Sequence, residues 1–228
     1  MSLSLEQKYA LISHFCNFIS EKRLELLKHV LDHRTRYATV VLEDIFQSQN
    51  ASAVLRSCDC FGVQDVHIIE NTNRFNVNPK VVMGASKWLT VSKYNRHDHN
   101  TLTAIKALRQ NGYRIVATSP HTYVTTLQDF DVEKGKFALL FGTELTGLSQ
   151  VALDNADEYL MIPTYGFSES LNISVSAALC LQNLTDRLRS SPVSYKLAEE
   201  ERANLFLEWL RKSIKSSRAI EKRFLEMS

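Results

Sequence analysis

The chain has 228 residues, a formal net charge of +2 and a hydrophobic share of 44%. This length allows one large or two small domains, and the apolar share is sufficient for a sizeable buried core. No apolar run reaches the roughly 20 residues of a membrane-spanning helix, and the N-terminus shows no secretory signal. We therefore expect a cytoplasmic protein that does not enter a membrane.

The four cysteines, at positions 16, 58, 60 and 180, are few and scattered. This usage is typical of reduced thiols in the cytoplasm. Cys58 and Cys60 have no second pair of ligands at zinc-like spacing, so we expect no metal site.

Charge is distributed unevenly along the chain. Residues 1–38 carry +2, residues 39–184 carry −3 and residues 185–228 carry +3. Basic flanks suit a polyanion such as RNA. Two solvated amphipathic helices would give the same pattern, so charge alone does not decide between the two explanations.

The periodicity of the sequence predicts helices at both ends and alternating strands and helices between them. The ends, 1–37 and 190–228, read as helical extensions, because Pro192 cannot continue the helix before it. Strands rich in β-branched and aromatic residues are predicted over 38–44, 65–70, 88–94, 113–119, 137–142 and 158–163. Helices are predicted over 50–61, 101–111, 149–155 and 171–189. Such alternation favours an α/β domain over 38–189 with a mostly parallel six-stranded sheet.

Several common signatures of α/β enzymes are absent from the sequence. The first predicted strand leads into LEDIFQSQNAS, which contains no glycine, so the dinucleotide-binding fingerprint is missing. Neither the Gly-rich phosphate loop nor the nucleophile elbow occurs elsewhere. The usual nucleotide-binding and hydrolase interpretations are therefore weakened.

The helix predicted after the first strand carries Asn50 at its start and Arg56 six residues later. Apolar residues recur at helical spacing from Ala51 to Phe61, and Gly62 is placed to end the helix. Arg56 points away from this apolar stripe, and the Asn50 amide is suited to cap the first turn. Taken alone, this segment is better explained as a capped helix with a solvated arginine.

Two further segments combine glycine with polar residues at the ends of predicted strands. In FGTELTG, Gly142 and Gly147 flank Glu144 and allow a tight loop whose backbone lies close to a ligand. In IPTYGFSESLNISVS, Ser170 and Asn172 precede a helix with small side chains. A plain strand-to-helix connection and a capped, closely packed helix are the structural alternatives.

In this order and spacing the three segments resemble the TrmH/SpoU family of RNA ribose 2′-O-methyltransferases, in the SPOUT superfamily. The resemblance covers about residues 38–189, and its second and third motifs are the most specific. Thr164 departs from the pattern, since relatives often have Met there. The key positions of the motifs all match, and they are Asn50, Arg56, Glu144, Ser170 and Asn172.

The resemblance implies a fold, a cofactor and an assembly. Family members have a C-terminal deep trefoil knot, bind S-adenosylmethionine at the knot and work as homodimers. Backbone groups of the glycine loop would hold the adenosyl moiety, between the apolar side chains of Ile162 and Leu171. The residues assigned to the cofactor in this way are Thr118, Gly142, Glu144, Gly147, Ile162, Leu171 and Asn172.

The resemblance also implies roles in methyl transfer. Arg56 matches the family's catalytic arginine, but a guanidinium with a pKa above about 12 is a poor general base. We therefore expect Arg56 to hold the RNA phosphate and stabilise the developing oxyanion, with a deprotonated arginine base as the alternative. Asn50 would orient Arg56, Ser170 and Asn172 would shape the donor loop, and Glu144 would fix its neighbours.

The short helical flanks resemble the branch that methylates guanosine 18 in the tRNA D-loop. Basic residues near the C-terminus are expected to contact phosphates, unless they form a solvated face: Arg211, Lys212, Lys215 and Arg218. Two other functions stay open: a ribosomal-RNA 2′-O-methyltransferase of the same fold, and a non-enzymatic RNA-binding protein. The intact Asn50, Arg56, Ser170 and Asn172 argue against the second.

Overall fold

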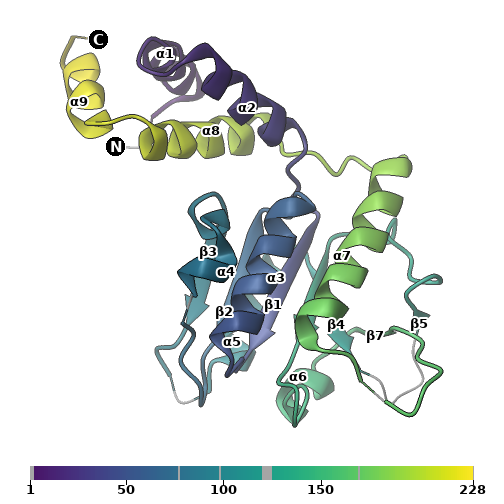
Figure 1. Cartoon of the computed structure of the whole chain (residues 1–228). Coiled ribbons are helices and arrows are strands. Elements are labelled where there is room, and N and C mark those ends of the chain that lie inside the picture. Colours follow the sequence, from purple (N-terminus) through teal and green to yellow (C-terminus); the bar gives the residue numbers. More distant parts are fainter. Residues whose placement is uncertain (1–2, 77, 98, 120–124, 169, 228) are drawn as a thin grey trace. The chain divides into compact units, whose positions relative to one another are not determined.

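The structure is a computed structural model that describes residues 3–76, 78–97, 99–119, 125–168 and 170–227 (Figure 1). The chain divides into two compact units. One is Thr35–Tyr195, and the other combines Met1–Arg34 with Lys196–Ser228. Within the described ranges, no helix is both long enough and apolar enough to cross a bilayer.

A parallel sheet forms the centre of the Thr35–Tyr195 unit. Its strands are β1 (Ala38–Glu43), β2 (Asp65–Ile69), β3 (Thr90–Tyr94), β4 (Arg114–Thr118), β5 (Thr125–Thr126), β6 (Phe137–Phe141) and β7 (Glu158–Met161). They pair in the order β3-β2-β1-β6-β4-β7-β5, and every pair is parallel. The α/β class and the parallel sheet are thus confirmed.

The prediction of six strands was wrong by one. The described residues form seven, because the two-residue strand β5 adds to β7 at the edge of the sheet. A strand of two residues has no alternation to read, so its pairing cannot be recognised from the sequence.

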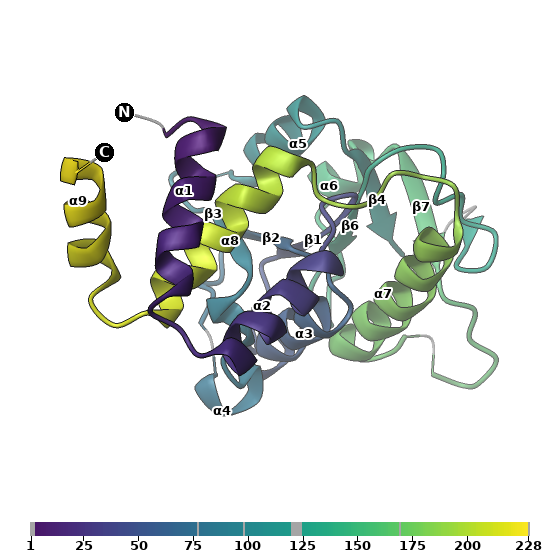
Figure 2. The ribbon, with the colours of Figure 1, turned by 90° about the horizontal axis from the view of Figure 1, so that it is seen from above.

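Helices cover both faces of the sheet. They are α3 (Ser48–Cys60), α4 (Pro79–Val82), the short 3-10 helix η1 (Ala85–Lys87), α5 (Thr101–Gln110), α6 (Gln150–Asp154) and α7 (Ile173–Ser190). Figures 1 and 2 show α3 and α7 side by side on one face. The helices α5 and α6 belong to the core on the other face, with Val41, Ile69 and Leu140. Because both faces are covered, β1 and β6 are buried along their whole length.

The four helices predicted for this unit are all present, but α3 begins differently from the prediction. Gln47 is its N-cap residue, so Asn50 lies inside the first turn and does not cap the helix. The amide of Asn50 instead bonds to residues of other loops. The other end agrees with the sequence, since Gly62 follows the helix with a φ of 78°.

The order of the strands places three loops beside one another. Parallel strands have their carboxyl ends at the same edge of the sheet, which is where α/β proteins bind ligands. Because β1 lies between β2 and β6, the segments that follow these three strands are neighbours at that edge.

The second unit is helical. It contains α1 (Leu5–Cys16), α2 (Glu21–Asp32), α8 (Glu199–Ser213) and α9 (Ser217–Met227), and α1 and α2 pack against α8 (Figure 2). Trp209 on α8 is the largest fully buried side chain, and the guanidinium carbon of buried Arg34 lies 5.3 Å from its ring centroid. An ion pair between Arg202 and Asp32 also joins α8 to α2.

Replacing Trp209 by Ala should lower the free energy of unfolding by about 3–5 kcal/mol, because it empties a fully buried site and removes a cation–π contact of Arg34. Urea unfolding followed by far-UV circular dichroism measures the loss. Trp209→Phe keeps an aromatic ring and should lose less. An unfolding curve identical to that of the unaltered protein would contradict the packing described here.

Candidate active site

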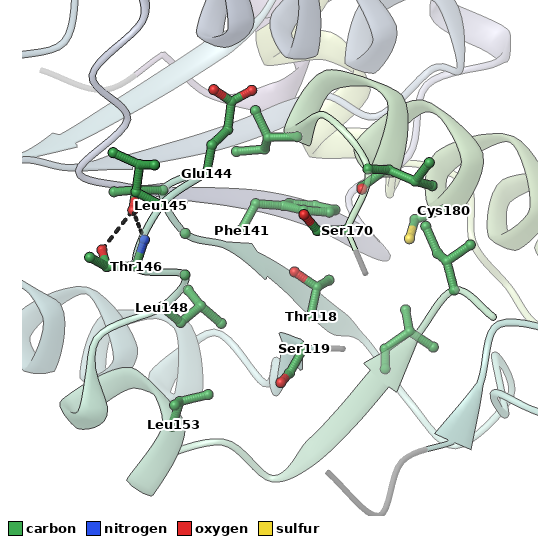
Figure 3. A pocket seen from close by; sticks show the side chains of 18 of the residues that line it. Thr118, Ser119, Phe141, Glu144, Leu145, Thr146, Leu148, Leu153, Ser170 and Cys180 are labelled. Atoms are coloured by element: carbon green, nitrogen blue, oxygen red, sulfur yellow. Dashed lines mark hydrogen bonds between the residues drawn. The ribbon is translucent and has the colours of Figure 1, made fainter. Parts of the chain in front are cut away.

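A cavity of about 450 Å³ lies at the carboxyl edge of the sheet, beside the ends of β4, β6 and β7. Its size is within the usual range for a small-molecule site. Figure 3 shows Thr118 and Ser119 on its wall, with Glu144 on one side and Leu153 on the opposite side. The loop 142–148, the segment after β7 and one face of α7 supply most of the remaining lining.

The loop after β6 turns back on itself, and two glycines make this possible. A Cβ atom on Gly142 would lie 2.1 Å from the carbonyl carbon of Gly147 and 2.3 Å from the nitrogen of Leu148. Gly147 has a φ of 69°, a conformation that favours glycine. The backbones of Thr143 and Gly147 exchange two hydrogen bonds of 3.0 Å. The loop therefore presents its backbone to the cavity in a fixed, narrow turn.

Three segments far apart in the sequence meet at the Glu144 carboxylate. Its Oε1 accepts hydrogen bonds from Asn50 Nδ2 at 2.8 Å and from Asn172 Nδ2 at 2.5 Å. Asn172 Nδ2 also donates to Asn50 Oδ1 at 3.2 Å. These three residues form what we call the Asn–Glu–Asn cluster. It ties the start of α3 and the start of α7 to the glycine loop.

Asn172 has a second function, as the N-cap of α7. Its Oδ1 accepts from the backbone nitrogen of Ser174 at 2.9 Å, which satisfies one of the unpaired donors of the first turn. One side chain therefore fixes both the beginning of α7 and the position of Glu144. The capped helix named as a structural alternative is therefore present, and its cap Asn172 also bonds to Glu144.

The cavity also contains residues that the sequence analysis did not single out. On α7, Ile173, Ser176 and Cys180 face it, at the i, i+3, i+7 spacing of one side of a helix. Burial raises the pKa of the Cys180 thiol to about 12, so this side chain remains protonated at neutral pH and acts as part of an apolar wall. The helical spacing after Asn172 was the signal that would have identified this face.

The residues assigned from the family motifs are not all in one place. The cavity is lined by Thr118, Gly142, Glu144, Gly147, Ile162, Ser170 and Leu171. Asn50 and Asn172 are outside the lining and contact it through Glu144. Arg56 lies on the exposed side of α3 and does not line the cavity. Among the described residues it has no hydrogen-bond or ion-pair partner.

Large apolar side chains are exposed around the cavity. Leu145 at the tip of the glycine loop is 98% exposed, and Tyr165 and Phe167 in the segment before α7 are equally open to solvent. Val175 and Leu179, four residues apart on α7, are also exposed. Exposed apolar side chains in such number around a cavity are typical of a surface that another molecule covers.

Among the described residues, no group of acidic, His or Cys side chains is arranged to hold a metal.

Comparison with known proteins identifies relatives that are similar over most of the chain. A tRNA (guanosine(18)-2′-O)-methyltransferase of Borreliella burgdorferi is 45% identical over 204 residues, which cover 90% of this chain and 91% of that protein. The solved structure of the A. aeolicus TrmH/SpoU tRNA modifying enzyme superposes with a TM-score of 0.74 at 27% identity. That superposition covers 86% of this chain and 98% of the other.

A more distant structure shares the fold. The SpoU methyltransferase AviRb from Streptomyces viridochromogenes, solved in complex with AdoMet, has a TM-score of 0.59 and an identity of 23%. It covers 71% of this chain and 64% of that one. Residues 37–182 match the sequence model of the SpoU rRNA Methylase family. The chain therefore belongs to this family, as its three motifs predict.

Proposed function

We propose that the protein transfers a methyl group from S-adenosylmethionine to the ribose 2′-hydroxyl of guanosine 18 in tRNA, in the cytoplasm. The observation that carries the proposal is the Asn–Glu–Asn cluster, which joins all three family motifs at one cavity. The relative from Borreliella burgdorferi, which is similar over 90% of this chain, has that activity in its name.

The cavity has the properties that S-adenosylmethionine requires. Leu148, Leu160, Ile162 and Leu171 give it apolar walls, and the narrow glycine loop from Gly142 to Gly147 forms part of the lining between them. Such a site suits an adenine ring, which stacks on apolar groups and bonds at its edge. The cofactor supplies an activated methyl group. The chain's residues hold the cofactor, exclude water from its methyl group and orient the ribose hydroxyl that attacks this group.

We propose that Arg56 acts on a neighbouring copy of the chain. It is exposed, lies outside the cavity of its own chain and keeps its guanidinium available for a phosphate or an oxyanion. We propose that two chains associate through the exposed apolar residues around the cavity, and that Arg56 of one chain serves the cavity of the other. The Asn–Glu–Asn cluster would then set the position of α3, and with it the position of Arg56.

Two of the four basic residues named near the C-terminus are paired with carboxylates in the structure. Arg211 donates to both carboxylate oxygens of Glu221 at 2.8 and 2.6 Å, and this pairing raises the pKa of Arg211. The Nζ atom of Lys212 lies 2.5 Å from Oε1 of Glu208. Lys215 and Arg218 are exposed and have no salt bridge to any described residue. We propose that these two contact the tRNA backbone.

The proposal extends to the architecture of the catalytic part. We propose that residues 38–189 form a knotted catalytic domain, with the extensions 1–37 and 190–228 serving the RNA. The match of residues 37–182 to the family's sequence model and the compact unit Thr35–Tyr195 support this division.

Labelled methyl groups from S-adenosylmethionine should enter a tRNA transcript that has guanosine 18, and should not enter one with 2′-deoxyguanosine at that position, because the attacking hydroxyl is missing. Nucleotide mapping locates the label. Label in ribosomal RNA in place of tRNA would overturn the choice of substrate. If no methyl group is transferred to any RNA, the proposed methyltransferase activity is wrong.

The variant Arg56→Ala should lose about 100-fold or more of its kcat, because it removes the group expected to stabilise the oxyanion. Its affinity for S-adenosylmethionine, measured by calorimetry, should not change. Arg56→Lys keeps the charge without the planar fork and should recover only part of the rate. Transfer by Arg56→Ala at the rate of the unaltered protein would exclude Arg56 from the mechanism.

The variant Gly142→Ala should abolish cofactor binding, because the added Cβ overlaps the backbone of Gly147 and Leu148. Gly166→Ala is the matched control, since a Cβ atom added there would lie 4.0 Å from its nearest neighbour, the backbone nitrogen of Ser168. This variant should bind the cofactor normally. Mixing the two inactive proteins Arg56→Ala and Gly142→Ala should restore part of the activity, because exchanged dimers have one intact site. Mixtures that remain inactive would contradict the shared site.

Replacing both Lys215 and Arg218 by Gln should weaken tRNA binding and lower the slope of log affinity against log salt by about 2, one for each lost phosphate contact. Affinity for S-adenosylmethionine should not change. Lys212→Gln, at a residue already paired with Glu208, should have a smaller effect. An unchanged salt slope in the double variant would remove these residues from the RNA interface.

A further inference from the structure

A buried carboxylate at the carboxyl end of β1 has no part in the chemistry proposed above. Glu43 is 2% exposed and accepts three hydrogen bonds. Its Oε1 accepts from Thr101 Oγ1 at 2.6 Å and from Ser149 Oγ at 2.8 Å, and its Oε2 accepts from the backbone nitrogen of Ser149 at 2.8 Å. A buried carboxylate needs such donors, and here two segments from opposite sides of β1 supply them.

Ser149 is the residue at which the glycine loop ends and α6 begins. It is the N-cap of α6, and its Oγ accepts from the nitrogen of Ala152 at 3.1 Å. Gly147 and Leu148, which line the cavity, come directly before it. By bonding both Oγ and the backbone nitrogen of Ser149, Glu43 fixes the position and the direction of the chain as it leaves the loop.

The bonds of Glu43 continue toward the segment after β2. Thr101 Oγ1 accepts from Asn71 Nδ2 at 2.9 Å, and Asn71 Oδ1 accepts from the nitrogen of Asn100 at 2.6 Å. The next residue, Asp44, accepts from the nitrogens of Asn71 at 2.7 Å and Thr72 at 2.8 Å. Two successive carboxylates at the end of β1 therefore hold the loops of its two neighbouring strands.

We infer that Glu43 is a positioning residue for the methyl-donor site. It anchors the glycine loop, through Ser149, in the shape that binds the cofactor, and it connects that loop through Thr101 to the segment after β2. This inference rests on the proposed function, because it assumes that the cavity binds S-adenosylmethionine.

Exchange of Glu43 for Gln isolates this role, because the two side chains have nearly the same shape. The carboxylate offers two acceptor oxygens, whereas the amide offers one acceptor and one donor. If the Gln side chain turns its amide nitrogen toward the backbone nitrogen of Ser149, two donors face each other and no hydrogen bond forms between them. The other orientation disturbs the hydroxyl bonds of Thr101 and Ser149. In either orientation one donor of Ser149, its backbone nitrogen or its hydroxyl, loses the oxygen that accepts from it.

Glu43→Gln should raise the Kd for S-adenosylmethionine about tenfold, which corresponds to about 1.4 kcal/mol. The value of kcat at saturating cofactor and the KM for tRNA should stay within about twofold of those of the unaltered protein, because the groups that act on the RNA are intact. Calorimetry gives the first quantity, and initial rates at varied cofactor and tRNA give the other two.

Glu158→Gln is the matched control. Glu158 is a largely buried carboxylate at the start of β7, at the opposite edge of the sheet, and it bonds to Arg114 and Lys134. Its loss should lower the unfolding midpoint and leave the affinity for the cofactor unchanged. Combining Glu43→Gln with Ser149→Ala should raise Kd by less than the product of the single effects, because both changes break the same contact.

If Glu43→Gln does not fold, Thr101→Val provides the second test, since it removes one donor to Glu43 without changing the glycine loop. It should raise the Kd by about threefold, a part of the full effect. A wild-type Kd in a folded Glu43→Gln protein, or in Thr101→Val where that variant is used, would overturn the role of Glu43. If the unaltered protein does not bind S-adenosylmethionine, the proposed function fails, and calorimetry of that protein alone shows this.

Discussion

The site depends on one carboxylate oxygen that accepts hydrogen bonds from two amides. Glu144 Oε1 joins Asn50, 94 residues earlier in the chain, to Asn172, 28 residues later. Asn50 and Asn172 also bond to each other, so these two bonds are what attach the glycine loop to the starts of α3 and α7. Because hydrogen bonds to a charged group are stronger than those between neutral groups, one carboxylate is sufficient to fix three segments.

The parallel sheet makes this meeting geometrically simple. With β1 between β2 and β6, the loops that carry the first two motifs leave the sheet side by side, and the third motif reaches them from β7. At the end of β1, Glu43 bonds to the end of the glycine loop and Asp44 bonds to the segment after β2. The positions of these loops are therefore set by strand order and by three carboxylates: buried Glu43, half-buried Asp44 and exposed Glu144.

Sequence reasoning identified the features that depend on local patterns. The apolar runs of β1 and β6, the helical spacing of α3 and the two loop glycines were all readable, because burial and backbone conformation restrict residue type. It missed β5, α4 and η1, which are too short to show a period. It also misjudged Asn50, because a polar residue near a helix start suggests a cap, whereas bonds to distant residues leave no trace in spacing. The same reason kept Glu43 out of view, whereas the helical spacing of Ile173, Ser176 and Cys180 was present in the sequence and was not used.

The wall of the cavity has a consequence for attempts to block it. Cys180 is the thiol that lines the cavity, and burial keeps its pKa near 12, so almost none of it is the thiolate that reacts with electrophiles. A covalent inhibitor directed at this pocket would have no activated sulfur to attack. Exposed Cys60 on α3, outside the pocket lining, would consume such a reagent first. Compounds that compete reversibly, by shape, are the better route to this site.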